Sequence, residues 1–303
     1  MKDYLNEIND SFPIRRTNEE KSSFFEYVSK ELGYERVKKE SIDKNNNIII
    51  GDIAEAKVVF TAHYDTPATS LIPNFMMPAN KILGSLIQIS YFLIIAIFSL
   101  LIAFGAGDLL NLDDSEIMLI YLLLYFGFTL CSTRLITNKN NKNDNTSGVA
   151  TIMSIASEIT DSKASFILFD NEEKGLLGSK AFNRKHKKLM ESKLVINLDC
   201  VGNGDNIIFI VKDKVKSTLE YKLLCDAFEE KDDHFAVHYI PFQRSNGNSD
   251  HKSFPCSVGV MAARKGRIVK FFTGRIHTAR DTVADNKNIE FLYTRFSEFI
   301  KKL

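Results

Sequence analysis

Two long apolar segments in the middle of the chain constrain its fold more than any other feature. Residues 82–106 and 117–133 contain no charged side chain. As a helix rising ~1.5 Å per residue, the first segment would be about 37 Å long, and a bilayer's hydrocarbon core is ~30 Å thick. The second is near the ~17-residue minimum, but it lengthens to 136 if Arg134 snorkels. The sequence therefore predicts a hydrophobic two-helix hairpin, with transmembrane helices at about 82–106 and 117–136.

Charged residues around these segments predict how the hairpin is oriented. The connection 107–116 carries four acidic residues and no Lys or Arg, whereas the outer flanks carry Lys81, Arg134, Lys139 and Lys142. By the positive-inside rule, both flanks are cytoplasmic. We therefore expect a multi-pass protein of the cell membrane, in contact with the lipid bilayer, whose remaining chain is cytoplasmic. A hydrophobic lid or a buried dimerisation hairpin is the alternative, but such helices need a polar outer face.

The overall composition excludes some function classes. Lys and Arg total 39 and Asp and Glu total 38 in 303 residues, so no basic field of the nucleic-acid-binding kind exists. The cysteines are scattered and form no C-x-x-C pair, so neither a disulfide framework nor a zinc ribbon is indicated. They are Cys131, Cys200, Cys225 and Cys256. We expect a reducing compartment. The polar N-terminus, residues 1–16, predicts no cleavable signal peptide.

Outside the hairpin, strand-like and helix-like segments alternate along the chain. This alternation predicts an α/β fold, a mixed β-sheet flanked by helices. Thr17 and Glu20 form a capping box that begins an amphipathic helix. Further helices are expected at 146–159, 175–190, 217–230 and 288–300. Strands are expected at 47–51, 57–61, 164–169, 194–198, 207–211, 235–242, 258–263 and 268–272.

Three of the expected apolar strands run directly into acidic or imidazole side chains. The strand at 57–61 leads to His63 and Asp65, the one at 164–169 to Glu172 and Glu173, and the one at 194–198 to Asp199. In open α/β sheets, ligands bind outside the carboxyl ends of the strands. Imidazole with carboxylates suits Zn²⁺ or its first-row neighbours. Each motif alone is weak, since a single strand-end residue often only caps a turn; together they predict a metal site.

Five motifs in one order resemble a known family. They are His63-Tyr64-Asp65, Asp144-Asn145-Thr146-Ser147-Gly148, the stretch 172–179 beginning Glu172-Glu173, Asn197-Leu198-Asp199, and His277-Thr278-Ala279-Arg280-Asp281-Thr282. Together they resemble the co-catalytic two-zinc aminopeptidases of metallopeptidase clan MH, such as bacterial leucyl aminopeptidase and aminopeptidase Y. The stretch 249–254 also looks like a segment of that family. The resemblance runs from about residue 58 to the C-terminus, apart from the apolar insert.

The resemblance implies a role for each matching residue. His63 and Asp199 are expected to bind one zinc ion, Glu173 and His277 the other, and Asp144 both. Asp65 is expected to accept a hydrogen bond from the His63 ring. Glu172 is expected to be the general base, on the assumption that neighbours in extended chain point opposite ways. The expected cofactors are two Zn²⁺ ions, or other first-row divalent metals.

The resemblance also implies an activity, a zinc-dependent aminopeptidase that hydrolyses N-terminal residues of peptides. Its catalytic domain would comprise residues 1–72 and 139–303, with the hairpin inserted at 73–138. Because the insert leaves soon after His63 and returns just before Asp144, we expect the active site near the cytoplasmic membrane face. Two alternatives stay open. One is an aminoacyltransferase resembling the single-zinc glutaminyl cyclases, and the other is a non-catalytic binding scaffold. The oligomeric state stays unknown.

The remaining histidines carry weaker expectations. His186 lies in the basic run 184–188 and is expected in solvent. His234 and His238 are expected on the surface, on one face of a strand, because no carboxylate motif accompanies them. For His251, a role beside the substrate and a role in packing both stay open.

Overall fold

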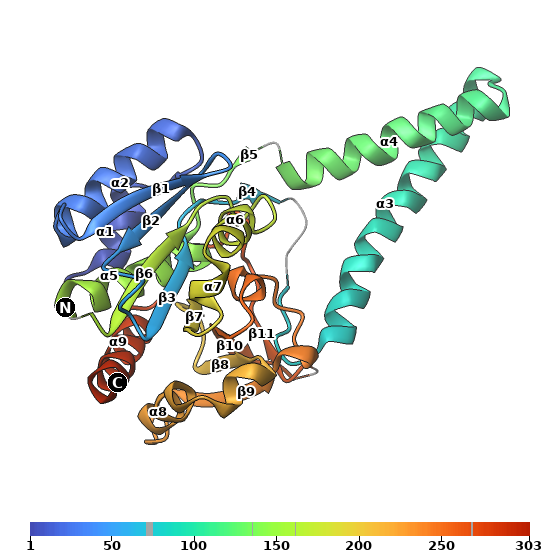
Figure 1. The fold of residues 1–303 in the computed structure, drawn as a ribbon. Helices are drawn as coiled ribbons and strands as arrows, with labels where there is room; N and C mark the ends of the chain where they lie inside the picture. Colours follow the sequence, from blue (N-terminus) through green and yellow to red (C-terminus); the bar gives the residue numbers. More distant parts are fainter. Residues whose placement is uncertain (71–74, 135, 161, 268) are drawn as a thin grey trace.

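A mixed β-sheet forms the centre of the computed structural model, which describes residues 1–70, 75–134, 136–160, 162–267 and 269–303. The strand order is β1-β2-β6-β3-β7-β10-β8-β9, with β11 beside β10 (Figure 1). The strands are β1 (Val37–Ile42), β2 (Asn45–Ile50), β3 (Val58–His63), β6 (Ala164–Phe169), β7 (Leu194–Leu198), β8 (Asn206–Val211), β9 (Ala236–Pro241), β10 (Ser257–Lys265) and β11 (Phe271–Phe272).

The central strands are parallel and completely buried. β3 pairs in parallel with β6 on one side and β7 on the other, and β7 pairs in parallel with β10. Every residue of β3, β6 and β7 is buried. Strands covered on both faces have nearly continuous apolar sequences, which is the pattern that these three show. Because they are parallel, their carboxyl ends, and the residues that follow them, meet at one edge of the sheet.

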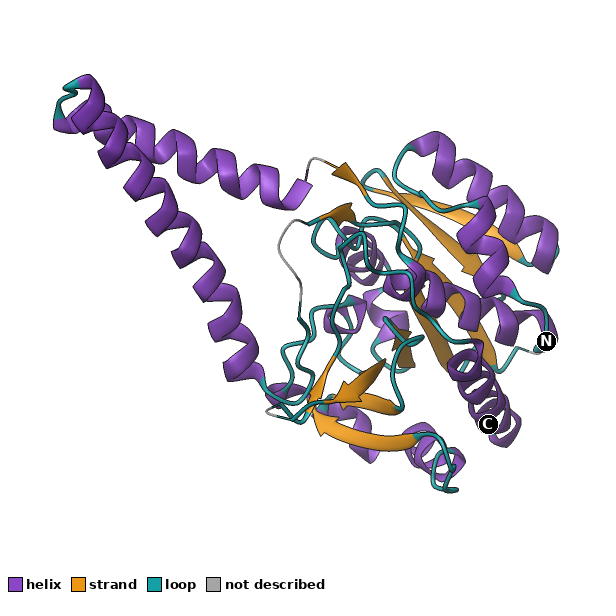
Figure 2. Cartoon of the chain, turned by 180° about the vertical axis from the view of Figure 1, so that it is seen from behind, coloured by secondary structure: helices purple, strands orange, loops and turns teal. Residues whose placement is uncertain are grey.

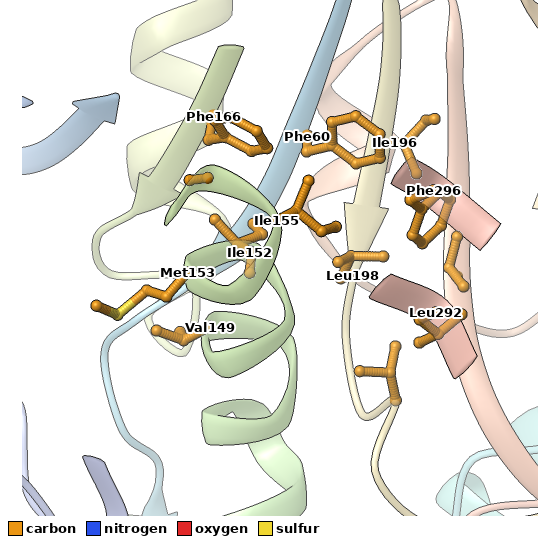
Figure 3. Close-up of a cluster of buried hydrophobic side chains, with 14 of the residues drawn as sticks. Phe60, Val149, Ile152, Met153, Ile155, Phe166, Ile196, Leu198, Leu292 and Phe296 are labelled. Atoms are coloured by element: carbon orange, nitrogen blue, oxygen red, sulfur yellow. The ribbon is translucent and has the colours of Figure 1, made fainter. Parts of the chain in front are cut away.

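Helices cover both faces of this sheet (Figure 2). The larger core lies on one face, where Phe60, Ile152 and Phe296 pack together among strand and helix side chains (Figure 3). Its helices are α1 (Tyr4–Ser11), α2 (Asn18–Leu32), α5 (Ser147–Glu158), α8 (Leu219–Ala227) and α9 (Asn286–Lys302). The smaller core on the other face includes Phe182 and Met190. Its helices are α6 (Leu177–Lys185) and α7 (Lys187–Met190). The predicted α/β class is confirmed.

Most expected elements are present, with informative differences. β6 and β7 have the predicted bounds, and the capping box of α2 forms, with Thr17 accepting from Glu20 N and Glu20 accepting from Thr17 N. The expected strand at 268–272 is β11 from Phe271, and residue 268 lies outside the described residues. The helix expected at 175–190 is divided at His186. Neither α1 nor β1 was predicted, because each has a narrow buried face among many polar residues.

The predicted hairpin consists of two antiparallel helices that project away from the sheet (Figure 1). They are α3 (Lys81–Leu110) and α4 (Asp114–Arg134). Both are long and apolar enough to cross a membrane. Within the most apolar 18-residue stretch of each helix, only 11% of residues in α3 and 6% in α4 are buried. The turn is shorter than expected. α3 continues through Asp108 because one charge does not break a helix, and it ends at Asn111 in the left-handed conformation.

Small residues let the outer parts of the two helices approach each other. Ser99, Ala103 and Gly107 are the buried residues of that part of α3, spaced four apart on one face. At the far end, Asp113 accepts from the backbone N–H groups of Ser115 and Glu116, which starts α4. The helices diverge toward the sheet, so the hairpin is open where it meets the rest of the molecule (Figure 2).

Both ends of the hairpin are hydrogen-bonded to the C-terminal segment 273–281. On the α3 side, Met76 and Thr273 exchange two backbone hydrogen bonds of 2.9 Å. The short strands β4 (Ala68–Thr69) and β5 (Ile136–Thr137) pair with each other, and Ser70 N donates to His277 O over 2.6 Å. On the α4 side, Asn138 Nδ2 donates to Thr278 O over 3.2 Å. Of the insert expected at 73–138, residues 73, 74 and 135 lie outside the described residues.

Candidate metal centre

The carboxyl ends of three parallel strands bring the predicted site residues together. His63 is the last residue of β3, Glu172 and Glu173 follow β6, and Asp199 follows β7. Asp144 comes from the segment Lys142–Thr146 that leads into α5, and His277 from the loop after β11. Two groups of three residues have ligand atoms within 4.8 Å of one another: His63 with Asp144 and Asp199, and Asp144 with Glu173 and His277.

Asp144 belongs to both groups and faces a different imidazole with each oxygen. Its Oδ1 lies 3.2 Å from His63 Nε2, and its Oδ2 lies 3.0 Å from His277 Nε2. His63 Nε2 is also 3.8 Å from Asp199 Oδ1, and His277 Nε2 is 3.3 Å from Glu173 Oε1. The grouping is the one that the resemblance implied for two neighbouring metal ions, with one histidine and one further carboxylate on each side of a shared aspartate.

Burial and charge set the protonation of the shared aspartate and of the histidines. Burial alone would raise the pKa of Asp144, but His277 and His63 outweigh it and hold that pKa below its usual value. Burial alone would lower the pKa of His63, yet Glu172, Asp144 and Asp199 raise it well above its ordinary value. Glu173 and Asp144 do the same for His277. The carboxylates therefore act on both rings as a concentrated negative charge.

The residue types fit a pair of divalent cations. Three carboxylates and only two imidazoles meet in these two groups, and Asp199 Oδ1 accepts no hydrogen bond from any described residue. Like charges that close together are costly in a buried site unless cations compensate them. Imidazole nitrogen and carboxylate oxygen are the ligands that Zn²⁺ takes in catalytic sites. The donor set therefore matches zinc, as the sequence predicts.

Glu172 and Glu173 lie in a turn and not in the extended chain expected from the sequence. Asn171 has φ +54°, and Gly175 N and Leu176 N both donate to Glu172 O over 2.8 Å. In this turn both carboxylates approach His63, because ligand atoms of His63, Glu172 and Glu173 lie within 4.8 Å of one another. A turn therefore brings both glutamates to the site. The expectation that they point in opposite directions from an extended chain is wrong.

Asp65 holds this turn in place. One of its carboxylate oxygens accepts from Glu172 N over 2.9 Å, and the other accepts from Glu173 N over 3.2 Å. The predicted carboxylate hydrogen bond to the His63 ring is replaced by a main-chain one. His63 Nδ1 lies 3.1 Å from the carbonyl oxygen of Asp65 and 3.6 Å from its carboxylate. An Nδ1–H donated to that carbonyl would leave Nε2 free to bind a metal.

Glu172 has the most perturbed environment of the carboxylates. Only 9% of the residue is exposed. Burial, followed by the nearby charges of Glu173, Asp250 and Asp199, raises its pKa well above the ordinary value, although His63 acts against this. A carboxylate whose basicity is raised in this way is suited to accept and release a proton near neutral pH.

Three buried residues around the site were not predicted. Asp281 accepts from Asn143 N and Asp144 N, and burial and Asp144 raise its pKa to about 7. Arg15, fully buried, donates to Tyr64 O over 2.6 Å and to Thr146 Oγ1 over 3.0 Å. Asp250 is also fully buried, with its pKa raised to about 7 by burial. Asp281 and Asp250 lay inside quoted motifs and could have been singled out, whereas no sequence pattern pointed to Arg15.

The remaining histidines lie outside the two groups. His186 is half-buried, against the expectation, because it stacks on Phe182 and lies 2.9 Å from Glu40 Oε1. His234 is exposed as expected but precedes β9, and His238 in β9 is half-buried against Phe271. His251 is 1% exposed and lies against Gly259 and Phe242, and burial lowers its pKa to about 3. These contacts favour the packing role for His251.

A cavity of about 890 Å³ opens beside the two groups of candidate metal ligands. Asp65, Glu173 and His277 line it on one side, and side chains of α3 line it on the other. Ligand sites commonly have volumes of roughly 300–1,000 Å³. The cavity is therefore large enough to hold several residues of a peptide next to the predicted ligands.

Several solved structures, two of them described as aminopeptidases, share the fold. The LapA aminopeptidase of Legionella pneumophila is 16% identical, with a TM-score of 0.54 over 98% of this chain and 69% of its own. LapB of Legionella pneumophila is 13% identical, with a TM-score of 0.56 over 99% and 70%. The zinc aminopeptidase BSAP of Bacillus subtilis is 17% identical, with a TM-score of 0.50 over 85% and 49%. At these identities the likeness concerns the fold.

Comparison of the sequence with protein-family models identifies the family. No curated protein matches it at a significant level. The model of the family described as peptidase family M28 matches residues 137–293, just over half of the chain, including the segments of Asp144, Glu173, Asp199 and His277. This match confirms the resemblance drawn from the five motifs, and with it the expectation of a metallopeptidase of the aminopeptidase type. The chain belongs to peptidase family M28.

Proposed function

We propose that this protein is a membrane-bound aminopeptidase that holds two zinc ions and removes N-terminal residues from peptides. The observation that carries the proposal is the shared aspartate, since Asp144 offers one oxygen to the His63 group and the other to the His277 group. His63 and Asp199 would hold one ion and Glu173 and His277 the other, with Asp144 between them. A bound zinc pair would lower the pKa of a water molecule and polarise the scissile carbonyl.

Glu172 is proposed to move the proton. A carboxylate oxygen of Glu172 accepts a proton from the attacking water, whose oxygen forms the new bond to the carbonyl carbon. Glu172 then delivers that proton to the amine nitrogen as the C–N bond breaks, so the base is regenerated. Asp65, through its hydrogen bonds to Glu172 N and Glu173 N, keeps the two glutamates in their places. Each glutamate thereby has one task, proton transfer for Glu172 and metal binding for Glu173.

The hairpin is proposed to place this chemistry at the cytoplasmic face of the membrane. Residues 1–72 and 139–303 would form the catalytic domain, with the hairpin inserted at 73–138. Two observations support this. The exposed apolar surface of α3 and α4 needs a lipid environment or a protein partner to cover it, because soluble monomers rarely expose apolar patches this large. Both ends of the hairpin are hydrogen-bonded to the segment that carries His277.

Metal content and hydrolysis together test the catalytic proposal. Protein purified in detergent should bind about two zinc ions per chain and release the N-terminal residue of aminoacyl amides, and a chelator should abolish that release. Elemental analysis under saturating zinc gives the stoichiometry. A single tight site, with cyclisation of N-terminal glutamine in place of hydrolysis, would support the cyclase alternative. Tight metal binding without turnover of either substrate would support the scaffold alternative.

Membrane extraction and thiol labelling test the topology. The protein should stay in the membrane pellet after an alkaline carbonate wash. In a Cys131→Ser background, Ser115→Cys at the hairpin turn should react with an impermeant thiol reagent in sealed cells. Lys139→Cys should react only after the cells are opened. Release by carbonate, or labelling of both cysteines from outside, would contradict the proposed topology without touching the proposed chemistry.

A further inference from the structure

The cavity beside the metal-binding groups has two chemically different ends. Asp65, Glu173 and His277 line one end. At the other end Ile87, Tyr91 and Ile95 line it, all from the first half of α3. These three residues are spaced four apart and therefore lie on one face of the helix. One continuous space thus runs from the proposed catalytic groups to the surface of a predicted transmembrane helix.

The remaining lining residues follow this division in part. Phe92 adds aromatic surface from α3, although Gln88 of α3 and Ser132 of α4 are polar, while Arg16, Asn171 and Lys174 add polar groups from the sheet side. Lys21, which also lines the cavity, forms a buried ion pair of 2.5 Å with Asp170. Acidic groups near the ligands suit a protonated peptide amine, and the α3 side suits an apolar chain. The polarity of the cavity therefore changes along its length.

The shape of the hairpin leaves this face of α3 available. α3 packs against α4 in the outer part of the hairpin, where Phe98 and Phe128 lie 5.7 Å apart. Toward the sheet the helices diverge (Figure 2), and Ile87, Tyr91 and Ile95 precede Phe98 along α3, on the side of the helix start. Their side chains border the cavity and are only partly exposed, whereas Ile89 and Ile94 are each 61% exposed. One face of α3 thus borders the cavity, and another is open to its surroundings.

We propose that this cavity selects apolar peptides taken from the bilayer, and that Ile87, Tyr91 and Ile95 determine that selectivity. The inference rests on the proposed aminopeptidase function and names its substrate class. The peptide amine and scissile bond lie at the end formed by Asp65, Glu173 and His277. The apolar side chains of the peptide lie against α3, in the opening between the two divergent helices. A soluble, polar peptide would leave the apolar surface of α3 in contact with water. Its binding free energy would therefore gain nothing from this side of the cavity.

Binding of a non-hydrolysed peptide tests this without relying on turnover. Glu172→Gln protein in detergent is titrated with two fluorescent octapeptides, one rich in leucine and one rich in serine and glycine, with the same N-terminal residue. Fluorescence anisotropy gives the two dissociation constants. The pair Ile87→Ala and Ile95→Ala is then added, and the matched control is the pair Ile89→Ala and Ile94→Ala. Both pairs make the same chemical change on the same helix.

We expect the leucine-rich peptide to bind at least about tenfold more tightly than the polar one, as pocket discrimination by a few methylenes allows. The pair at 87 and 95 should remove most of that preference, and the pair at 89 and 94 should keep it. Equal effects of the two pairs would overturn the inference. A second result would also overturn the inference, in favour of a lipid occupant. Native mass spectrometry would detect phospholipid bound to the protein, and neither double variant would change peptide binding.

Failure of the function and failure of the inference can be told apart. If the leucine-rich peptide binds with the expected dependence on Ile87 and Ile95, but wild-type protein hydrolyses no peptide, the inferred selectivity stands and the proposed activity is wrong. If wild-type protein hydrolyses aminoacyl amides but treats the two octapeptides alike, the activity stands and the inferred substrate class is wrong.

Discussion

The sheet region and the hairpin use the same apolar residue types in opposite ways. Phe60, Ile196 and Phe296 are 0% exposed in the sheet region, whereas Leu93, Ile94 and Leu123 of the hairpin are 57%, 61% and 66% exposed. In the sheet region, apolar runs of five or six residues are covered by helices on both faces. In the hairpin, most side chains of helix residues 81–110 and 114–132 are not covered by the rest of the protein. The first region buries its apolar side chains within the protein, whereas the exposed apolar side chains of the second would be covered by lipid, as we propose, or by a protein partner.

Close packing differs between the regions as well. A Cβ added at Gly148 would lie 2.6 Å from Leu198 O, and one added at Gly178 would lie 2.2 Å from Asp170 O. At Gly105 and Gly127 in the hairpin, a Cβ would meet nothing within 4 Å. The sheet region therefore positions its ligands through tightly fitted backbone segments. In the hairpin, close packing is confined to particular contacts, such as Gly107 against Ile117 and Gly84 against Asn246, and the face that carries Gly105 and Gly127 is open.

The largest expected effect is on kcat, and it should distinguish a residue of the proposed active site from a residue on the hairpin surface. Glu172→Gln should lower kcat by roughly 10²–10⁴-fold, because proton transfer is removed while metal ligands remain. Metal content by elemental analysis should stay unchanged. Leu93→Ala, on the exposed surface of α3, should keep wild-type kcat. Glu173→Gln should instead weaken one metal site. Loss of metal from the Glu172 variant, with full metal in the Glu173 variant, would show that the two roles are reversed.

A buried ion pair in the sheet region should give the next largest effect. Lys21 and Asp170 are 4% and 1% exposed, and their charged atoms are 2.5 Å apart. Lys21→Met leaves Asp170 buried without its partner, which typically costs about 3–5 kcal/mol. Thermal unfolding of the full chain in detergent measures the loss. Lys30→Met, at an exposed position on the same helix, is the control, and equal unfolding temperatures for the two variants would contradict the assigned pairing.

Two glycine substitutions compare packing in the two regions directly. Gly148→Ala should destabilise the protein by about 1–3 kcal/mol, because its Cβ would crowd Asn145 and Leu198 O in the segment that positions Asp144. Gly127→Ala in α4 should leave the unfolding temperature unchanged or slightly higher, since alanine favours helix. Metal affinity should fall only in the Gly148 variant. A loss of stability at Gly127 would mean that this face of the hairpin is packed and not open.

The smallest effects should come from helix capping. Thr17→Ala removes the capping box of α2 and should cost about 1 kcal/mol of unfolding free energy. Asp113→Ala removes the same kind of cap at the hairpin turn, far from the sheet. Because no core depends on that turn, we expect the Asp113 variant to unfold at the wild-type temperature. A large global loss there would indicate that the hairpin and the sheet region unfold as one unit.

Prediction from the sequence succeeded where the signal was local. The bounds of β6 and β7 follow from short apolar runs ended by polar residues. α1 and β1 were not predicted, because each has few buried residues among many polar ones. The ends of the hairpin helices were misplaced because charge was taken as a boundary, although Asp108 is accommodated within α3. Periodicity and composition locate an element, but helix ends depend on caps such as Asn111 and Asp113.

The apolar hairpin, the alternating strands and helices, and the motifs at the strand ends could all be found in the sequence, because each is a pattern of neighbouring residues. Which oxygen of Asp144 faces which histidine, and that Asp65 holds the turn of Glu172 and Glu173, became known from the folded chain. It alone joined Ile87 of α3 to the cavity of His277. Those contacts join residues far apart in the chain, so they depend on its path through space and leave no local pattern.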